Sequence, residues 1–180
     1  ESGQERFVRR TAPVIVGRLA ENHFRDNFRQ GGFVDRELRP WPRTRRQQSG
    51  AGTAESQYGP LLSSRKHLMS SVEHTTYDYG ALVYNRVPYA PIHNWGGTTH
   101  PTVTPRMRRA AGGGKKNGTG KTAGGEEAEQ WKRLALTKKK KITVRIPQRQ
   151  FLGTSARLEE TIRKELENEL EAQLIELNIR

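Results

Sequence analysis

Several residue types and patterns are scarce in this 180-residue sequence. It has no cysteine, which excludes disulfides, thiol catalysis and cysteine-ligated zinc. No apolar run approaches the ~18 to 20 residues that span a bilayer, and no signal peptide is recognisable, so we expect no membrane association. Only 32% of residues are hydrophobic, against 18 glycines and 9 prolines. We therefore expect one domain over 1–180 with a small core and long loops.

Acidic residues are also scarce outside the C-terminus. The net charge is +13, yet from Leu158 to Arg180 seven glutamates face three basic residues, a net charge of −4. The preceding residues therefore carry +17. This asymmetry predicts attraction to nucleic acid or to acidic protein surfaces and leaves the fold open.

The glycine-rich stretch from Gly112 to Gly125 ends in Gly120-Lys121-Thr122, the letters that close a phosphate-binding P-loop. In a P-loop the first glycine stands five positions before Gly120, where this sequence has Lys115. The stretch also lacks a preceding buried strand and a following helix start. We interpret it as part of a basic loop and expect no nucleotide or other cofactor.

Catalytic and metal-binding patterns are missing too. No His-Glu-x-x-His pair or carboxylate cluster accompanies the histidines, and no serine stands in a Gly-x-Ser-x-Gly turn. The sequence therefore predicts neither an enzyme nor a metal site. The histidines are His23, His67, His74, His93 and His100.

The first third of the chain predicts a helix followed by a loop. Apolar residues recur every three to five positions over 5–29, which indicates an amphipathic helix, kinked at Pro13 or starting near Ala12 and ended by Gly31-Gly32. Residues 33–58 lack a sustained period and predict a loop, with Trp41 as an anchor against the core.

The middle of the chain predicts short elements. Residues 59–74 indicate a short helix that runs into a strand pair with Asp78-Tyr79-Gly80 as its turn, and residues 88–97 a turn-rich or single-turn helical segment. From Thr98 to about Ala128 we expect an extended loop, and 126–136 could form a short helix. Over 98–137 we predict a flexible basic insertion or arm that is ordered only in an assembly.

The C-terminal part predicts a strand and a long helix. Ile142, Val144 and Ile146 alternate with polar residues, as in a half-buried strand. Ser155 can cap a helix from Ala156, in which leucines and one isoleucine recur every four residues along one face. The predicted fold class is α+β, with a small antiparallel sheet packed against long N-terminal and C-terminal helices and with extended loop insertions.

Basic residues gather in several runs that could contact DNA or another subunit through phosphates or carboxylates. No recognition-helix or RNA-module signature accompanies them, so any nucleic-acid contact would be electrostatic and independent of sequence. These candidates are Arg43, Arg45, Arg46, Arg106, Arg108, Arg109, Lys115, Lys116, Lys121, Lys138, Lys139, Lys140 and Lys141.

Three fragments, taken in order, resemble one family. They are GPLLSSRKHLMSSV, VPYAPIHNWGG and IPQRQFLG, the last of them before the C-terminal helix. They are similar to segments of the virion-morphogenesis or tail-completion proteins of Mu-like tailed bacteriophages. Asn94 stands where glutamine is usual, and Gln150 where proline is common. The candidate fold or interface residues are Trp41, Leu61, Leu62, Leu68, Tyr89, Ala90, His93, Trp95, Gly96, Pro147, Arg149, Phe151, Leu152 and Gly153.

The resemblance implies a non-enzymatic neck protein at the head-tail junction of a virion, assembled in the bacterial cytoplasm. Its expected partners are further copies in a ring, expected to be six-fold, with other head-tail neck, connector and tail proteins and genomic DNA in the lumen. An alternative is a basic nucleic-acid-binding protein of ribosomal or chromatin type. A third possibility is a small toxin or nuclease, which the missing metal-ligand cluster disfavours.

Overall fold

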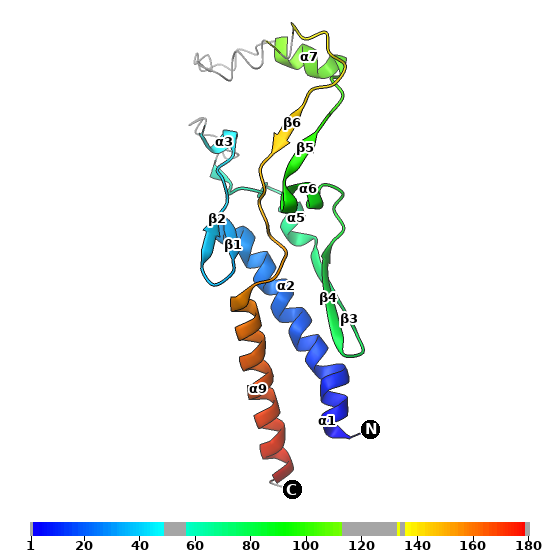
Figure 1. The fold of residues 1–180 in the computed structure, drawn as a ribbon, viewed down its shortest axis with the longest axis vertical. Helices are drawn as coiled ribbons and strands as arrows, with labels where there is room; N and C mark the ends of the chain where they lie inside the picture. Colours follow the sequence, from blue (N-terminus) through cyan, green and yellow to red (C-terminus); the bar gives the residue numbers. More distant parts are fainter. Residues whose placement is uncertain (1, 49–56, 113–132, 134–135, 179–180) are drawn as a thin grey trace. The chain divides into compact units, whose positions relative to one another are not determined.

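A computed structural model describes residues 2–48, 57–112, 133 and 136–178 of the chain. These residues divide into two compact units, each considered by itself. Unit 1 comprises Glu1–Gly96 and Pro147–Arg180, and unit 2 comprises Gly97–Ile146. The fold is α+β, with helices at the N- and C-terminal ends and antiparallel strand pairs between them, which confirms the predicted class (Figure 1).

The N-terminal helical segment responds to Pro13 as expected. α1 (Gly3–Arg6) leads into a π-helical turn, η1 (Phe7–Thr11), and α2 (Ala12–Gln30) begins one residue before the proline. Proline lacks a backbone donor, so a widened turn and a fresh start at Ala12 accommodate it. Gly31 ends α2 in the left-handed region, at φ 69°, where residues with a side chain are disfavoured.

The chain after α2 corrects the expectation of a loop over 33–58. β1 (Gly32–Val34) pairs antiparallel with β2 (Leu38–Pro40), and a single helical turn, α3 (Arg45–Gln48), follows. All three residues of β1 are buried, so this strand shows no alternation by which sequence could reveal it. Trp41 is 6% exposed, and its Nε1 donates to the Gln150 carbonyl at 2.7 Å, as an anchor requires.

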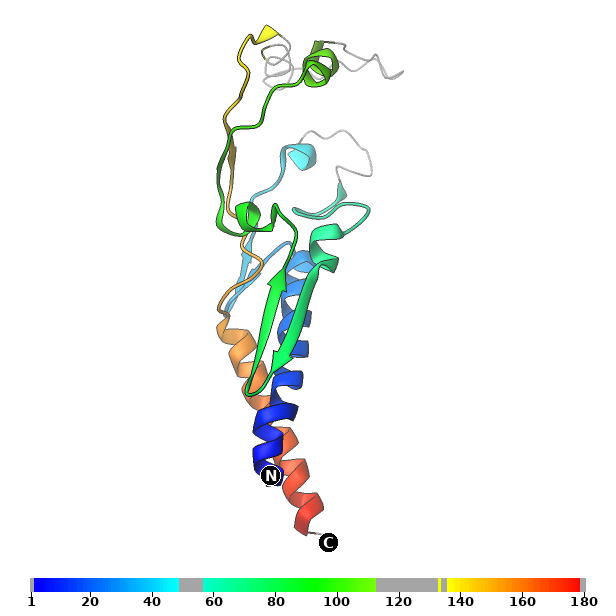
Figure 2. The same cartoon turned by 90° about the vertical axis from the view of Figure 1, so that its right-hand side faces the viewer.

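The middle of unit 1 follows the prediction closely. α5 (His67–Ser70) leads into β3 (Val72–Tyr77), which pairs in register with β4 (Gly80–Asn85), and α6 (Ala90–Trp95) ends at Gly96. The β3–β4 hairpin packs against α2, and Figure 1 shows α2 lying between this hairpin and α9 (Ala156–Asn178). Figure 2 shows the hairpin running along α2.

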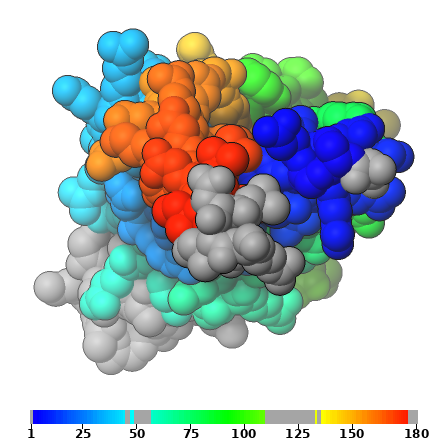
Figure 3. All heavy atoms as spheres, turned by 90° about the horizontal axis from the view of Figure 1, so that it is seen from below, coloured from blue at the N-terminus to red at the C-terminus, as the bar shows by residue number. Residues whose placement is uncertain are grey.

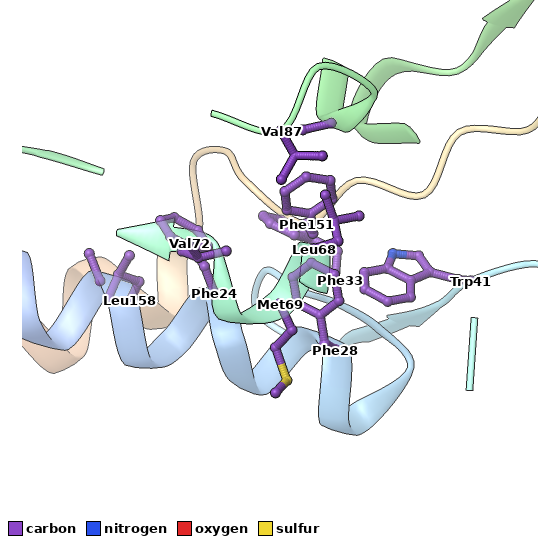
Figure 4. Close-up of a cluster of buried hydrophobic side chains, with 12 residues drawn as sticks. Phe24, Phe28, Phe33, Trp41, Leu68, Met69, Val72, Val87, Phe151 and Leu158 are labelled. Carbon is purple, nitrogen blue, oxygen red and sulfur yellow. The ribbon is translucent and has the colours of Figure 1, made fainter. Parts of the chain in front are cut away.

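The core of unit 1 is built around aromatic side chains. Phe28 and Phe151 are fully buried with their ring centroids 5.0 Å apart, and Trp41 meets Phe28 edge-on (Figure 4). Aromatic rings bury large areas and gain further from tilted contacts. The buried members of this cluster are Ala20, Phe24, Phe28, Phe33, Trp41, Leu68, Met69, Val72, Val87, Ala90, Phe151 and Leu158.

The C-terminal helix α9 starts as predicted, because Ser155 Oγ accepts from the Leu158 amide at 3.1 Å. Asp35, in the β1–β2 turn, adds a second cap by accepting from the Ala156 amide at 3.0 Å. The prediction of one buried apolar face is wrong beyond the first turns. Leu158 is buried and Ile162 packs on the core, whereas Leu174 is 52% exposed.

Unit 2 contains the strand pair formed by β5 (Gly97–Thr99) and β6 (Val144–Ile146), and the helix α7 (Pro105–Gly112). The expected loop from Thr98 is therefore wrong for the described part of that stretch. The strand expected at Ile142–Ile146 is shorter than predicted, and Val144 is exposed. The flexibility of 98–137 and its ordering on assembly stay predictions.

Candidate functional site

Two buried asparagines hold the segment that follows Pro147 against the body of unit 1. Asn94 Oδ1 accepts from the amides of Phe151 and Leu152 at 2.8 and 2.9 Å, and its Nδ2 donates to the Leu152 carbonyl. Asn27 donates to the Phe151 carbonyl at 3.3 Å and accepts from the Val34 amide. The Asn94 side chain therefore makes the backbone hydrogen bonds that a neighbouring strand would otherwise make with residues 151 and 152.

The approach of these segments also depends on Gly96. Its φ is 71°, and a Cβ there would lie 2.8 Å from the Gln148 backbone nitrogen. Beside it, the Arg149 amide donates to the His93 carbonyl at 2.8 Å. Two fragments that carried the family resemblance, around 89–96 and 147–153, are thus joined directly by backbone contacts.

A cavity of about 240 Å³ lies where these fragments meet the residues before α5. Its walls combine leucines, two histidine rings and a tyrosine ring, with the Arg149 side chain among them. The Tyr89 ring meets the His93 ring edge-on at 5.9 Å and lies 6.4 Å from the His67 ring, centroid to centroid. The lining residues are Thr44, Leu61, Leu62, Ser63, His67, Leu68, Tyr89, His93 and Arg149.

The charge of this cavity comes from Arg149. Its side chain is 7% exposed, and its Nε donates to the Pro42 carbonyl at 3.0 Å. Burial lowers the pKa of the Arg149 guanidinium, which still stays charged because arginine ionises far above neutral pH. Burial, and then the charge of Arg149, lower the pKa of His93 below its ordinary value of 6.5.

The candidate motif residues divide between core and surface. Leu68, Ala90 and Phe151 are buried, while Leu61, Leu62 and Leu152 pack partly against the core. Trp95 and Tyr89 are instead 67% and 45% exposed. The inward face of α6 consists instead of Ala90 and Asn94, four positions apart. Pro147 is exposed and Gly153 is half-buried.

Two of the basic runs come together within unit 2. The Arg108 side chain donates to the Lys139 carbonyl at 3.1 Å, and the Val103 amide donates to the Lys140 carbonyl at 2.8 Å. Arg106, Arg109 and Lys138 to Lys141 are exposed, so we define them as the basic surface of unit 2. Arg43, Arg45 and Arg46 belong to unit 1, where Arg43 is exposed. Lys115, Lys116 and Lys121 lie outside the described residues.

Neither a metal centre nor a membrane span is found in the part of the chain that the structure describes. No group of three or more His, Asp or Glu side chains there is placed to hold a metal ion. No described helix is long and apolar enough to cross a bilayer. The candidate binding groups of the described residues are a buried arginine in unit 1 and exposed cations in unit 2.

The family resemblance identified Tyr89, His93 and Arg149 as candidates, but the sequence did not predict that they line one cavity. It missed Asn27 entirely and left Asn94 without a role. In the sequence, Asn27 is a polar residue next to Phe28 in a predicted helix. An asparagine on the surface would give the same pattern, so its buried role could not be recognised.

One of the comparisons with known proteins finds a family for this chain. The family model described as the phage virion morphogenesis family matches residues 27–171, which include both asparagines and Arg149. Comparison with curated proteins and with solved structures gives no match. The matched residues cover most of the chain, from the last turn of α2 into α9. The chain therefore belongs to the phage virion morphogenesis family, whose members are structural proteins of phage assembly rather than enzymes.

Proposed function

We propose that the protein is a tail-completion component that joins head and tail at the phage neck, and that it acts as a homo-oligomeric ring with six-fold symmetry. Membership of the phage virion morphogenesis family supports a role in building the virion. The exposed apolar side chains of α9 support assembly with further copies.

The observation that supports the ring is the exposure of apolar residues in the C-terminal half of α9, which we call its outer half. Its apolar residues recur every four positions, and at about 100° per residue each step rotates the stripe by about 40° around the helix. Leu158 faces α2, but the stripe has turned by roughly 160° when it reaches Leu174. Leu170 and Leu174 are consequently 39 and 52% exposed. An apolar helix face of this kind is typical of an interaction surface.

A second surface of unit 1 has the complementary character. Arg6, Arg10, Thr11, Val14 and Ile15 line an open depression of about 520 Å³ on the N-terminal helical segment. This depression offers cations and apolar side chains, whereas the outer half of α9 offers leucines and glutamates. Figure 3 views the end of unit 1 where this segment and α9 are both exposed. Two different complementary surfaces on one chain suit head-to-tail contacts, which form a ring when the rotation from copy to copy closes.

The ring is tested by a charge introduced into the exposed stripe. Leu170→Lys with Leu174→Lys should abolish rings in negative-stain images and shift the protein to monomer in light scattering. The reason is that burying two charged lysine side chains in an apolar interface is costly. Asn168→Lys with Ala172→Lys is the matched control, because both positions are exposed on another side of α9. Equal ring formation by both double variants would refute the stripe on α9 as the ring contact, and a monomeric wild-type protein would refute the ring itself.

The position at the neck is tested in the phage. Lysates of a phage that lacks this protein should contain filled heads and free tails that are not joined, and supplying the protein should restore complete virions. Normal joining without the protein would contradict a neck role and leave only a more general role in assembly.

A second candidate function is supported by the basic surface of unit 2, which brings Arg106 and Arg109 beside a run of four lysines. Such a surface suits the phosphate backbone of DNA in the neck lumen or a separate nucleic-acid-binding role. Titration of duplex DNA at two salt concentrations separates these possibilities. Tight binding by the isolated monomer with a steep salt dependence favours an independent nucleic-acid-binding protein, and weak binding favours the neck component.

A further inference from the structure

The cavity around Arg149 holds a positive charge that has no acidic partner among the described residues. Within the described part of the chain, the side chain of Arg149 makes one hydrogen bond, from Nε to the Pro42 carbonyl, and no ion pair. Its two terminal nitrogens have no hydrogen-bond partner among the described residues, and they are not among the side-chain atoms that are closed off from solvent. The rest of the residue is more than nine-tenths buried, so the guanidinium is held in place with donors that a ligand can reach.

His93 adds a second incomplete group to the same cavity. Its Nδ1 atom is fully buried and has no hydrogen-bond partner among the described residues. The charge of Arg149 and the ring of Tyr89 lie near its ring, and the His67 ring lies 6.4 Å from the Tyr89 ring. No carboxylate of the described chain is paired with this cluster, so a ligand that brings negative charge would pair with Arg149 and would favour a charged His93.

We propose that this cavity is a receptor for one side-chain carboxylate of a neighbouring virion protein, which Arg149 binds through its two terminal nitrogens. The planar guanidinium matches the two oxygens of a carboxylate. Leu61, Leu62 and Leu68 line the same cavity and suit the methylene groups of a glutamate.

A protein carboxylate fits this site better than a DNA phosphate does. Arginines that contact the DNA backbone are exposed, like those of unit 2, whereas Arg149 lies within a cavity with apolar walls. The carboxylate can come from a second copy of this chain or from a different neck protein. The inference goes beyond the proposed ring, because it holds for either source.

The first test uses the isolated wild-type protein and N-acetylglutamate amide as the probe. Adding the probe should shift the NMR signals of the Arg149 Nε–H group and the His93 ring with a common saturation curve. It should also raise the pKa of His93, because a bound anion favours the imidazolium. N-acetylglutamine amide is the matched neutral control and should bind at least about tenfold more weakly.

Variants test the assignment to Arg149. Arg149→Met should abolish the response to the probe, and a two-dimensional NMR spectrum checks that the variant is folded. His93→Gln leaves the guanidinium in place and should weaken binding of the probe by a few-fold. This second variant tests the site if Arg149→Met does not fold. The absence of any probe-dependent shift in both the wild-type protein and the Leu170→Lys, Leu174→Lys variant would overturn the proposal. So would tighter binding of inorganic phosphate or duplex DNA to the same groups.

The source of the carboxylate is identified by cross-linking in assembled particles. In Arg149→Lys, carbodiimide should join the introduced amine to the bound carboxylate, and mass spectrometry of the cross-linked peptide names the donor chain. A cross-link to this protein's own sequence assigns a second copy, and one to another protein assigns a neck partner. Probe binding without ring formation would refute the ring alone. Rings of the wild-type protein, together with no probe binding by the Leu170→Lys, Leu174→Lys variant, would refute the receptor alone.

Discussion

Units 1 and 2 achieve order by different means. Unit 1 packs aromatic side chains around Phe28 and Phe151 and satisfies buried polar groups through Asn27 and Asn94. Unit 2 relies on the pairing of β5 with β6, and Val103 is its one buried hydrophobic residue among those described. Stabilising contacts and the candidate binding cavity are therefore concentrated in unit 1, while unit 2 has few buried side chains and an exposed basic surface.

The largest expected effect is on the core of unit 1. Phe151→Ala should lower the free energy of unfolding by about 3 to 5 kcal/mol, because it leaves a cavity beside Phe28 and removes a fully buried ring. Chemical denaturation followed by tryptophan fluorescence measures this. Trp95→Ala removes an aromatic side chain that is 67% exposed and should change stability by no more than about 0.5 kcal/mol. Similar losses in the two variants would contradict the assignment of the core.

A smaller but still substantial loss is expected at the polar clamp. Asn94→Ala leaves the amides of Phe151 and Leu152 without their acceptor, and each buried unsatisfied donor costs about 1 to 3 kcal/mol. We expect a total of about 2 to 4 kcal/mol, with faster hydrogen exchange at these two amides. Asn168→Ala, on the exposed side of α9, is the control. Unchanged exchange at residues 151 and 152 would show that another group can replace Asn94.

These residues also show how far sequence can predict such a fold. The response to Pro13, the β3–β4 hairpin and the cap at Ser155 depend on neighbours a few positions away, so their patterns are visible in the sequence. Asn94 and Phe151 are 57 positions apart, and no local pattern tells a buried clamp from a surface asparagine.

The long helix and the binding cavity show the same limit. A four-residue recurrence in α9 predicted a single buried face, whereas the geometry of the helix turns that stripe away from the body after Ile162. Likewise, the sequence contained Arg149 and His93 in separate fragments, and only the fold places both beside one cavity. Local patterns thus predicted the elements of unit 1, while the candidate site depends on long-range contacts.

The smallest expected effect lies in unit 2. Val103→Ala removes two methyl groups from a side chain that is 5% exposed, which should cost about 1 to 2 kcal/mol within unit 2. Since its amide donates to the Lys140 carbonyl, and the Ile142 amide donates to the Pro101 carbonyl, hydrogen exchange at Val103 and Ile142 should accelerate. Thr102→Ala, at an exposed neighbouring position, should leave this exchange nearly unchanged. The denaturation midpoint of unit 1 should stay the same in both variants, because its core contains no residue of unit 2. A lowered midpoint after Val103→Ala would mean that the two units unfold together, and the contrast between them would then describe their packing but not their stability.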